Sequence, residues 1–127
     1  MLKFLSIFIL FFVHLSCYSQ NNKQFEKFSP ISTNYLNKIV KAIYQVEGGN
    51  KTKYPFGIKS INTNGNYNKA KKICENTVRN NYIRWQRAGK KGNYLDFLGN
   101  RYCPPSSDKQ GNINWKRNMH KLVDNHK

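Results

Sequence analysis

The segment IVKAIYQVEGGNKTKYPFGIKS, residues 39–60, decides how this chain folds and where its chemistry lies. Leu36, Val40 and Ile43 precede Glu47 at helical spacing, so its carboxyl is expected on the buried stripe of a helix that two glycines then end. A carboxyl in an apolar setting keeps its proton more readily and can donate it. Glu47 is therefore a candidate general acid. The alternative is an exposed, chemically inert helix end.

Helical periodicity continues on both sides of this segment, whereas residues 54–61 are aromatic and β-branched and precede the turn signal NTNGN at residues 62–66. The pattern predicts an α+β fold that is mainly α, a helical domain with a small β-hairpin lobe. The remaining helices are expected over residues 69–88, from Asn93 with Asp96 as its capping-box partner, and from Asn114, and the first helix is expected to be capped by Ser32 or Thr33.

The first residues have the pattern of an export signal. Lys3 precedes an apolar run over residues 4–13, which is shorter than the roughly 20 residues that span a bilayer. We expect residues 1–19 to be removed, residues 20–31 to form a linker or arm, and residues 32–127 to form one domain of an exported, periplasmic or secreted protein. Attachment of a lipid at Cys17, or retention of the segment as an N-terminal helix, are the alternatives.

Cysteine usage agrees with export. Removal or lipidation of Cys17 leaves Cys74 and Cys103, and two cysteines in an oxidising compartment predict one disulfide. Two buried thiols are the alternative. The cysteines have no histidine partner at zinc spacing, so we expect neither a metal nor another cofactor.

The charge balance predicts a polyanionic partner. The chain has 22 Lys and Arg against 6 Asp and Glu, a formal net charge of +16. Nucleic acid, anionic lipid and acidic cell-wall polymers all match this charge. Arginines and aromatic residues alternate over residues 79–87, but no nucleic-acid-binding motif accompanies them. One function compatible with these features is that of a non-catalytic basic protein that binds cell-wall polymer or nucleic acid, and we expect a monomer.

Two short motifs carry a resemblance to a known family. IYQVEGG at residues 43–49, followed by YPFGI at residues 54–58, resembles the lysozyme-like superfamily, nearest to the single-glutamate goose-type lysozymes and lytic transglycosylases. The resemblance implies helices packed about a small β lobe, with a cleft that holds the glycan strands of peptidoglycan. It also implies that Glu47 protonates the glycosidic oxygen.

The resemblance carries further expectations for the site. Tyr54, Phe56 and Tyr102 are the aromatic residues expected to bind substrate, and Ser60 is expected to reach the sugar. Lys59-Ser60 stand where the transglycosylase motif usually has Met-Gln, and no second carboxylate follows Glu47 closely. A single acid implies assistance by the N-acetyl group of the substrate. The resulting prediction is a secreted peptidoglycan-cleaving glycosidase or lytic transglycosylase that leaves either a 1,6-anhydro sugar or a reducing end.

Overall fold

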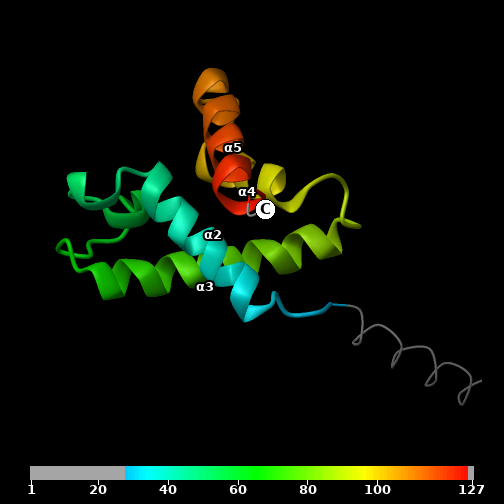
Figure 1. The fold of residues 1–127 in the computed structure, drawn as a ribbon, viewed down its shortest axis with the longest axis horizontal. Coiled ribbons are helices and arrows are strands. Elements are labelled where there is room, and N and C mark those ends of the chain that lie inside the picture. Colours follow the sequence, from blue (N-terminus) through cyan, green and yellow to red (C-terminus); the bar gives the residue numbers. More distant parts are fainter. Residues whose placement is uncertain (1–27, 126–127) are drawn as a thin grey trace, which may run out of the picture.

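The computed structural model describes residues 28–125 (Figure 1). The expected signal over residues 1–19, Cys17 and most of the expected arm over residues 20–31 lie outside this range. Within it, no helix combines the length and the hydropathy needed to cross a membrane. The described elements are the α-helices α2 (Thr33–Val46), α3 (Tyr67–Arg87), α4 (Tyr94–Tyr102) and α5 (Lys109–Val123), with the single-turn 3₁₀ helices η2 (Gly49–Lys51) and η3 (Pro55–Gly57).

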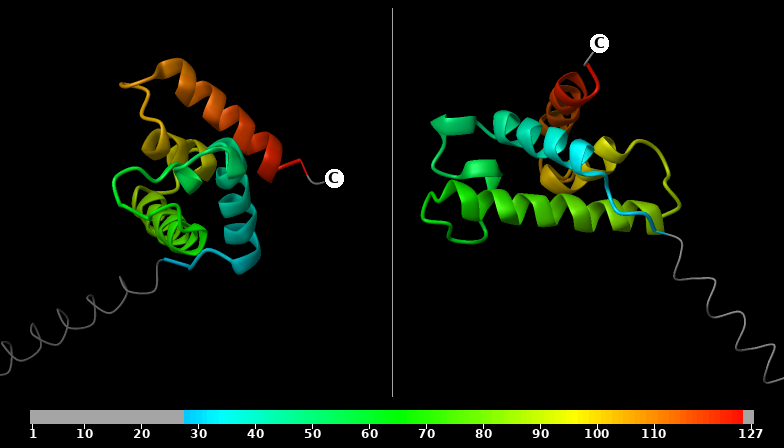
Figure 2. Two further views of the ribbon diagram at one scale, coloured as in Figure 1. Left: turned by 90° about the vertical axis from the view of Figure 1, so that its left-hand side faces the viewer. Right: turned by 60° about the horizontal axis from the view of Figure 1, so that its bottom comes forward.

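The four α-helices enclose one core. α2 packs against α3 and α5, and α4 packs against the same two helices. The ribbon views show α5 standing across the direction of α3, with α2 crossing α3 obliquely (Figures 1 and 2). The largest fully buried side chains come from each of the four α-helices and from η3: Phe56, Leu36, Ile39, Ile43, Leu95, Leu98, Met119, Val78 and Cys74.

Side-chain caps set where these helices begin. Ser32 and Asn93 cap α2 and α4, as predicted. The predicted start of the last helix at Asn114 is wrong, because α5 begins directly after Asp108. The Asp108 carboxylate accepts a hydrogen bond from the backbone N–H of Gly111 at 2.8 Å, which satisfies one of the free donors at the helix start.

The predicted β-hairpin lobe is also wrong. No residue in the described range 28–125 lies in a strand, so the described fold is helical and not α+β. Pro55 has no N–H to donate to a strand partner. Phe56 and Gly57 follow with φ of 60° and 70°, two successive left-handed residues that turn the chain and cannot continue an extended strand.

The turn predicted over residues 62–66 does form. Asn64 and Gly65 both have positive φ, at 51° and 69°, and the Asn66 N–H donates to the Thr63 carbonyl at 2.9 Å. Asn66 then caps α3 by accepting a hydrogen bond from the Lys69 N–H at 2.9 Å. The turn therefore starts a helix instead of joining two strands.

Candidate active site

Glu47 lies at the end of α2, where the chain reverses. It is the C-cap of the helix, and its backbone N–H still donates to the Ile43 carbonyl at 2.9 Å. Gly48 follows with φ of 106°, a conformation that favours glycine. The predicted helix end is confirmed, and the Glu47 side chain is half-buried.

The Glu47 carboxylate is bound by an indole from the last helix. The Nε1–H of Trp115 donates to Glu47 Oε1 at 2.9 Å, and the Trp115 side chain is buried in the core. Because a buried indole keeps few rotamers, this hydrogen bond fixes the direction of the carboxyl group. α5 therefore orients an acid that belongs to α2.

The other carboxylate oxygen lies against Gly57. A Cβ atom at this position would stand 2.5 Å from Glu47 Oε2, closer than any real contact of that kind, and Gly57 has φ of 70°. Only glycine leaves room for the carboxyl here. The two motifs, IYQVEGG and YPFGI, are therefore in contact through Glu47 and Gly57.

A groove of about 400 Å³ opens beside Gly57. Its polar side chains are two cations, Lys59 and Arg101, and three hydroxyls, those of Ser60, Thr77 and Tyr102. Its complete lining is Phe56, Gly57, Ile58, Lys59, Ser60, Ile61, Ile73, Thr77, Arg101 and Tyr102.

Tyr102 lines this groove and also contacts Trp115, which binds the Glu47 carboxyl. Its ring stacks on Trp115 with the centroids 5.3 Å apart, and its hydroxyl shares a hydrogen bond of 3.4 Å with Cys74 Sγ. Burial is the main cause that raises the pKa of Tyr102 well above its ordinary value, so the hydroxyl stays protonated. The tyrosine thus gives the groove a neutral aromatic side chain that also supports Trp115.

The other predicted binding residues take different positions. Ser60 is exposed and lines the groove. Tyr54 is exposed but does not line it, and Lys53 Nζ and Lys59 Nζ lie 5.0 and 5.8 Å from its ring centroid. Phe56 lines the groove from beneath, and with 1% exposure its ring is part of the core.

Cys74 and Cys103 are free thiols in the structure. Cys74 contacts the Tyr102 hydroxyl, and Cys103 Sγ lies 3.9 Å from the Asp108 carbonyl. Burial raises the pKa of Cys74 to about 11, against the opposite effect of its hydrogen bond with Tyr102. The disulfide between these residues stays a prediction.

Trp115 and Arg101 are not among the residues that the sequence predicted for the site. A usable signal for Trp115 did exist. A tryptophan on a buried stripe has an indole N–H that needs an acceptor, and a carboxyl on another buried stripe is a strong candidate. Nothing in the sequence pattern indicated that Arg101 would face the groove.

The described residues hold no group of three or more His, Cys, Asp and Glu side chains that could bind a metal ion. The acid of the candidate site is Glu47, with Trp115, Gly57 and Tyr102 about it. No protein-family model, curated protein or solved structure matches this chain.

Proposed function

We propose that this protein is an exported enzyme that cleaves the glycan strands of peptidoglycan, as a lytic transglycosylase or a muramidase, with Glu47 as its general acid and base. The observation that carries the proposal is the setting of the Glu47 carboxyl. One of its oxygens is held by Trp115, and the other lies against Gly57. Gly57 lines the groove, although Glu47 itself is not among the lining residues.

The distribution of acids supports the same assignment. Glu75 pairs with Lys71 at 3.8 Å, and Asp108 caps α5. Asp96 and Asp124 both bind His120. Each of these four carboxylates has a structural partner within its helix or between helices. Glu47 binds a neutral indole instead, so among the described residues its carboxyl takes part in no ion pair and no N-terminal helix cap.

The proposed reaction needs one carboxyl. Glu47 gives its proton to the glycosidic oxygen as the bond between this oxygen and the anomeric carbon breaks. At the same time, the anomeric carbon is attacked by the oxygen of the N-acetyl group on its own sugar ring. The Glu47 carboxylate then removes a proton from the incoming hydroxyl, whose oxygen attacks the anomeric carbon and breaks the bond between that carbon and the N-acetyl oxygen. If that hydroxyl is the sugar's own 6-hydroxyl the product is a 1,6-anhydro sugar, and if it belongs to water the product is a reducing end.

The substitution Glu47→Gln tests this role, because glutamine keeps the size and the acceptor oxygen for Trp115 but has no proton to give. We expect release of soluble muropeptides from purified sacculi to fall by about a hundredfold or more, the usual contribution of a general acid. Mass spectrometry of the released fragments identifies the anhydro or the hydrolytic product.

Glu75→Gln is the matched control, since it makes the same chemical change in α3, where Glu75 pairs with Lys71. We expect this variant to release fragments at the rate of the unmodified protein. Equal release by Glu47→Gln and the unmodified protein would remove Glu47 from its role. Sacculi that bind the protein but are never cleaved would favour the non-catalytic alternative.

A further inference from the structure

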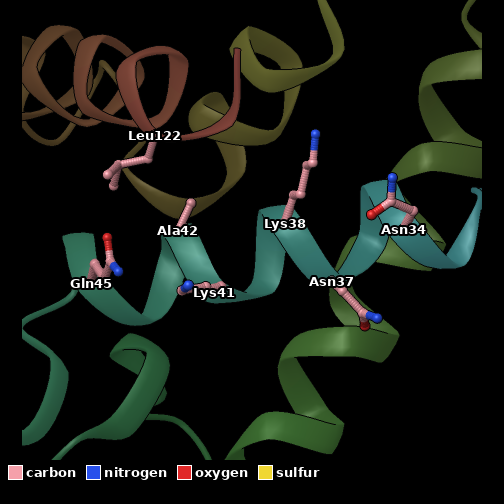
Figure 3. A pocket seen from close by; sticks show the side chains of 7 residues that line it. All are labelled: Asn34, Asn37, Lys38, Lys41, Ala42, Gln45 and Leu122. Atoms are coloured by element: carbon pink, nitrogen blue, oxygen red, sulfur yellow. The ribbon is translucent and has the colours of Figure 1, made fainter. Parts of the chain in front are cut away.

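The outer face of α2 has two hollows that the proposed reaction does not use. One, of about 320 Å³, lies between α2 and Leu122 of α5 (Figure 3). The other, of about 500 Å³, lies between α2 and the start of α3. Asn37, Lys41 and Gln45 line both hollows, so the two are neighbours on one continuous surface.

This surface points away from Glu47. Successive residues of an α-helix are turned by about 100°, which places the stripe from Asn34 to Gln45 roughly opposite Glu47 on the helix. The stripe covers about 17 Å along the axis at 1.5 Å per residue. It therefore lies on another side of α2 from Glu47 and is long enough for a short oligomer, although Phe56 lines both the larger hollow and the groove beside Gly57. We call it the α2 face, defined by Asn34, Asn37, Lys38, Lys41 and Gln45.

The chemistry of the α2 face combines amides with cations. Asn34, Asn37 and Gln45 each carry both a donor and an acceptor, which is what sugar hydroxyl and acetamido groups require. Lys38 and Lys41 supply positive charge. Among the described residues that line the two hollows, none is acidic.

The larger hollow adds aromatic surface. Tyr44 and Tyr67 both line it, with ring centroids 5.4 Å apart and nearly perpendicular planes. Tyr67 is 46% exposed, so its ring keeps an open surface that the apolar side of a sugar ring can cover. Lys71 lines the same hollow, but its charge is paired with Glu75 at 3.8 Å, so within residues 28–125 the free cations of this surface are the two lysines of the α2 face.

We propose that the α2 face binds a strand of acidic polysaccharide, with the lysines on its anionic groups, the amides on its hydroxyls, and a sugar ring against Tyr67. Positive charge alone would attract any polyanion. The amides and the open aromatic ring add groups that bind the hydroxyls and the apolar ring face of a sugar. This binding does not depend on the chemistry of Glu47.

The test measures binding of a fluorescent hexasaccharide of galacturonic acid by anisotropy, in the Glu47→Gln background so that no cleavage can intervene. Replacing both Lys38 and Lys41 by glutamine is expected to weaken binding roughly tenfold. The matched control replaces Lys90 and Lys91, two exposed lysines that line neither hollow, and is expected to change binding by less than about twofold.

A charge-neutral pair separates sugar recognition from charge. Asn37→Ala with Gln45→Ala removes two amides and no charge, and is expected to weaken binding of the hexasaccharide but not of oligodeoxythymidylate. Thermal melting checks that every variant is folded.

Three results would overturn the proposal. They are no binding of the hexasaccharide, an equal loss from both lysine pairs, and tighter binding of oligodeoxythymidylate with the same dependence on Lys38 and Lys41. The cleavage of sacculi by protein with an intact Glu47 is a separate measurement, so the failure of either proposal leaves the other standing.

Discussion

Glu47 and Trp115 are hydrogen-bond partners from two different helices. They lie 68 residues apart in the chain, and the buried indole of Trp115 has an N–H that would be costly to leave without an acceptor. The indole donates and the carboxylate accepts, so both are satisfied by one hydrogen bond. Trp115 is in this sense a positioning residue for the proposed acid.

Trp115→Phe removes the donor and keeps an aromatic ring in the core. We expect kcat on sacculi to fall about tenfold with little change in KM, because the carboxyl loses its fixed direction while the groove keeps its lining. Loss of a hydrogen bond to a carboxylate is also expected to lower the free energy of unfolding by about 1.5–3 kcal/mol. Steady-state kinetics and urea unfolding measure the two effects.

Trp85→Phe is the control, since this indole also donates a hydrogen bond, to the Gly92 carbonyl at 3.3 Å, in another part of the fold. It is expected to affect stability but not kcat. An equal fall of kcat in both variants would mean that Trp115 acts only through stability. An unchanged kcat in Trp115→Phe would show that the carboxyl needs no such support.

For single residues, the sequence predicted the position of Glu47 on its helix but not its hydrogen-bond partner. The spacing from Leu36 to Glu47 is local, and helix geometry turns it directly into a shared face. The pairing with Trp115 depends on how α5 crosses α2, which no local pattern contains. The same holds for Tyr102, whose stacking on Trp115 requires α4 and α5 to be packed together.

Among the elements, α4 and α5 are joined by a histidine between two carboxylates. His120 Nε2 lies 2.9 Å from Asp96 Oδ1, and His120 Nδ1 lies 2.7 Å from Asp124 Oδ2. The hydrogen bond to Asp124 is the main cause that raises the pKa of His120 above its ordinary 6.5, and partial burial opposes it. Asp96, predicted to close a capping box with Asn93, instead binds the neighbouring helix.

This cluster predicts stability that depends on pH. Because the folded state raises the pKa of His120, folding favours the protonated imidazole. The stabilisation is fully present below pH 6.5, the ordinary value, and is lost as the pH rises through the raised pKa of the folded state. The groups are partly exposed, so we expect at most about 1 kcal/mol.

Urea unfolding of the unmodified protein and of His120→Gln at about pH 5.5 and about pH 8.5 measures this effect. The unmodified protein should be the more stable of the two at the lower pH, and the difference should shrink at the higher one. A double-mutant cycle with Asp96→Asn isolates the link between α4 and α5. A difference that does not change with pH would exclude a charged His120.

The elements that the sequence predicts correctly are those whose signals are local. Ser32 and Asn93 accept hydrogen bonds from residues two or three positions ahead, so a short motif is enough to predict them. The prediction of a β-hairpin is wrong because a strand needs a partner strand, and because the left-handed conformation of Phe56 and Gly57 interrupts the extended chain. Asn114 was predicted to begin the last helix, but the Asp108 side chain caps α5 at an earlier position.

Across the molecule as a whole, Cys74 and Cys103 differ in how deeply their thiols are buried. Cys74 is completely buried in the core, and the pKa of its thiol is about 11. Cys103 is half-exposed at the end of α4, and its pKa is raised, first by desolvation and then by nearby Asp108. Because the thiolate is the reactive form, the two should differ strongly in reactivity.

We expect a thiol reagent to modify one cysteine per molecule, Cys103, in the reduced native protein that carries Cys17→Ser. Modification of Cys74 should require unfolding of the core, so its rate should follow the free energy of unfolding when urea is added. Mass spectrometry of the labelled peptides identifies the modified residue. Cys103→Ser should abolish the fast reaction, and Cys74→Ser should leave it unchanged.

The same experiment decides the predicted disulfide and connects it to the proposed site. A Cys74–Cys103 bridge would leave no reactive thiol until a reductant is added, and it would take Cys74 Sγ from the Tyr102 hydroxyl, to which it now lies at 3.4 Å. Since Tyr102 stacks on Trp115, and Trp115 holds Glu47, oxidation should then change kcat as well as stability. Equal labelling of both cysteines in the native state would contradict the buried position of Cys74. Oxidation that closes the bridge without changing kcat would show that Tyr102 does not support the Glu47 carboxyl.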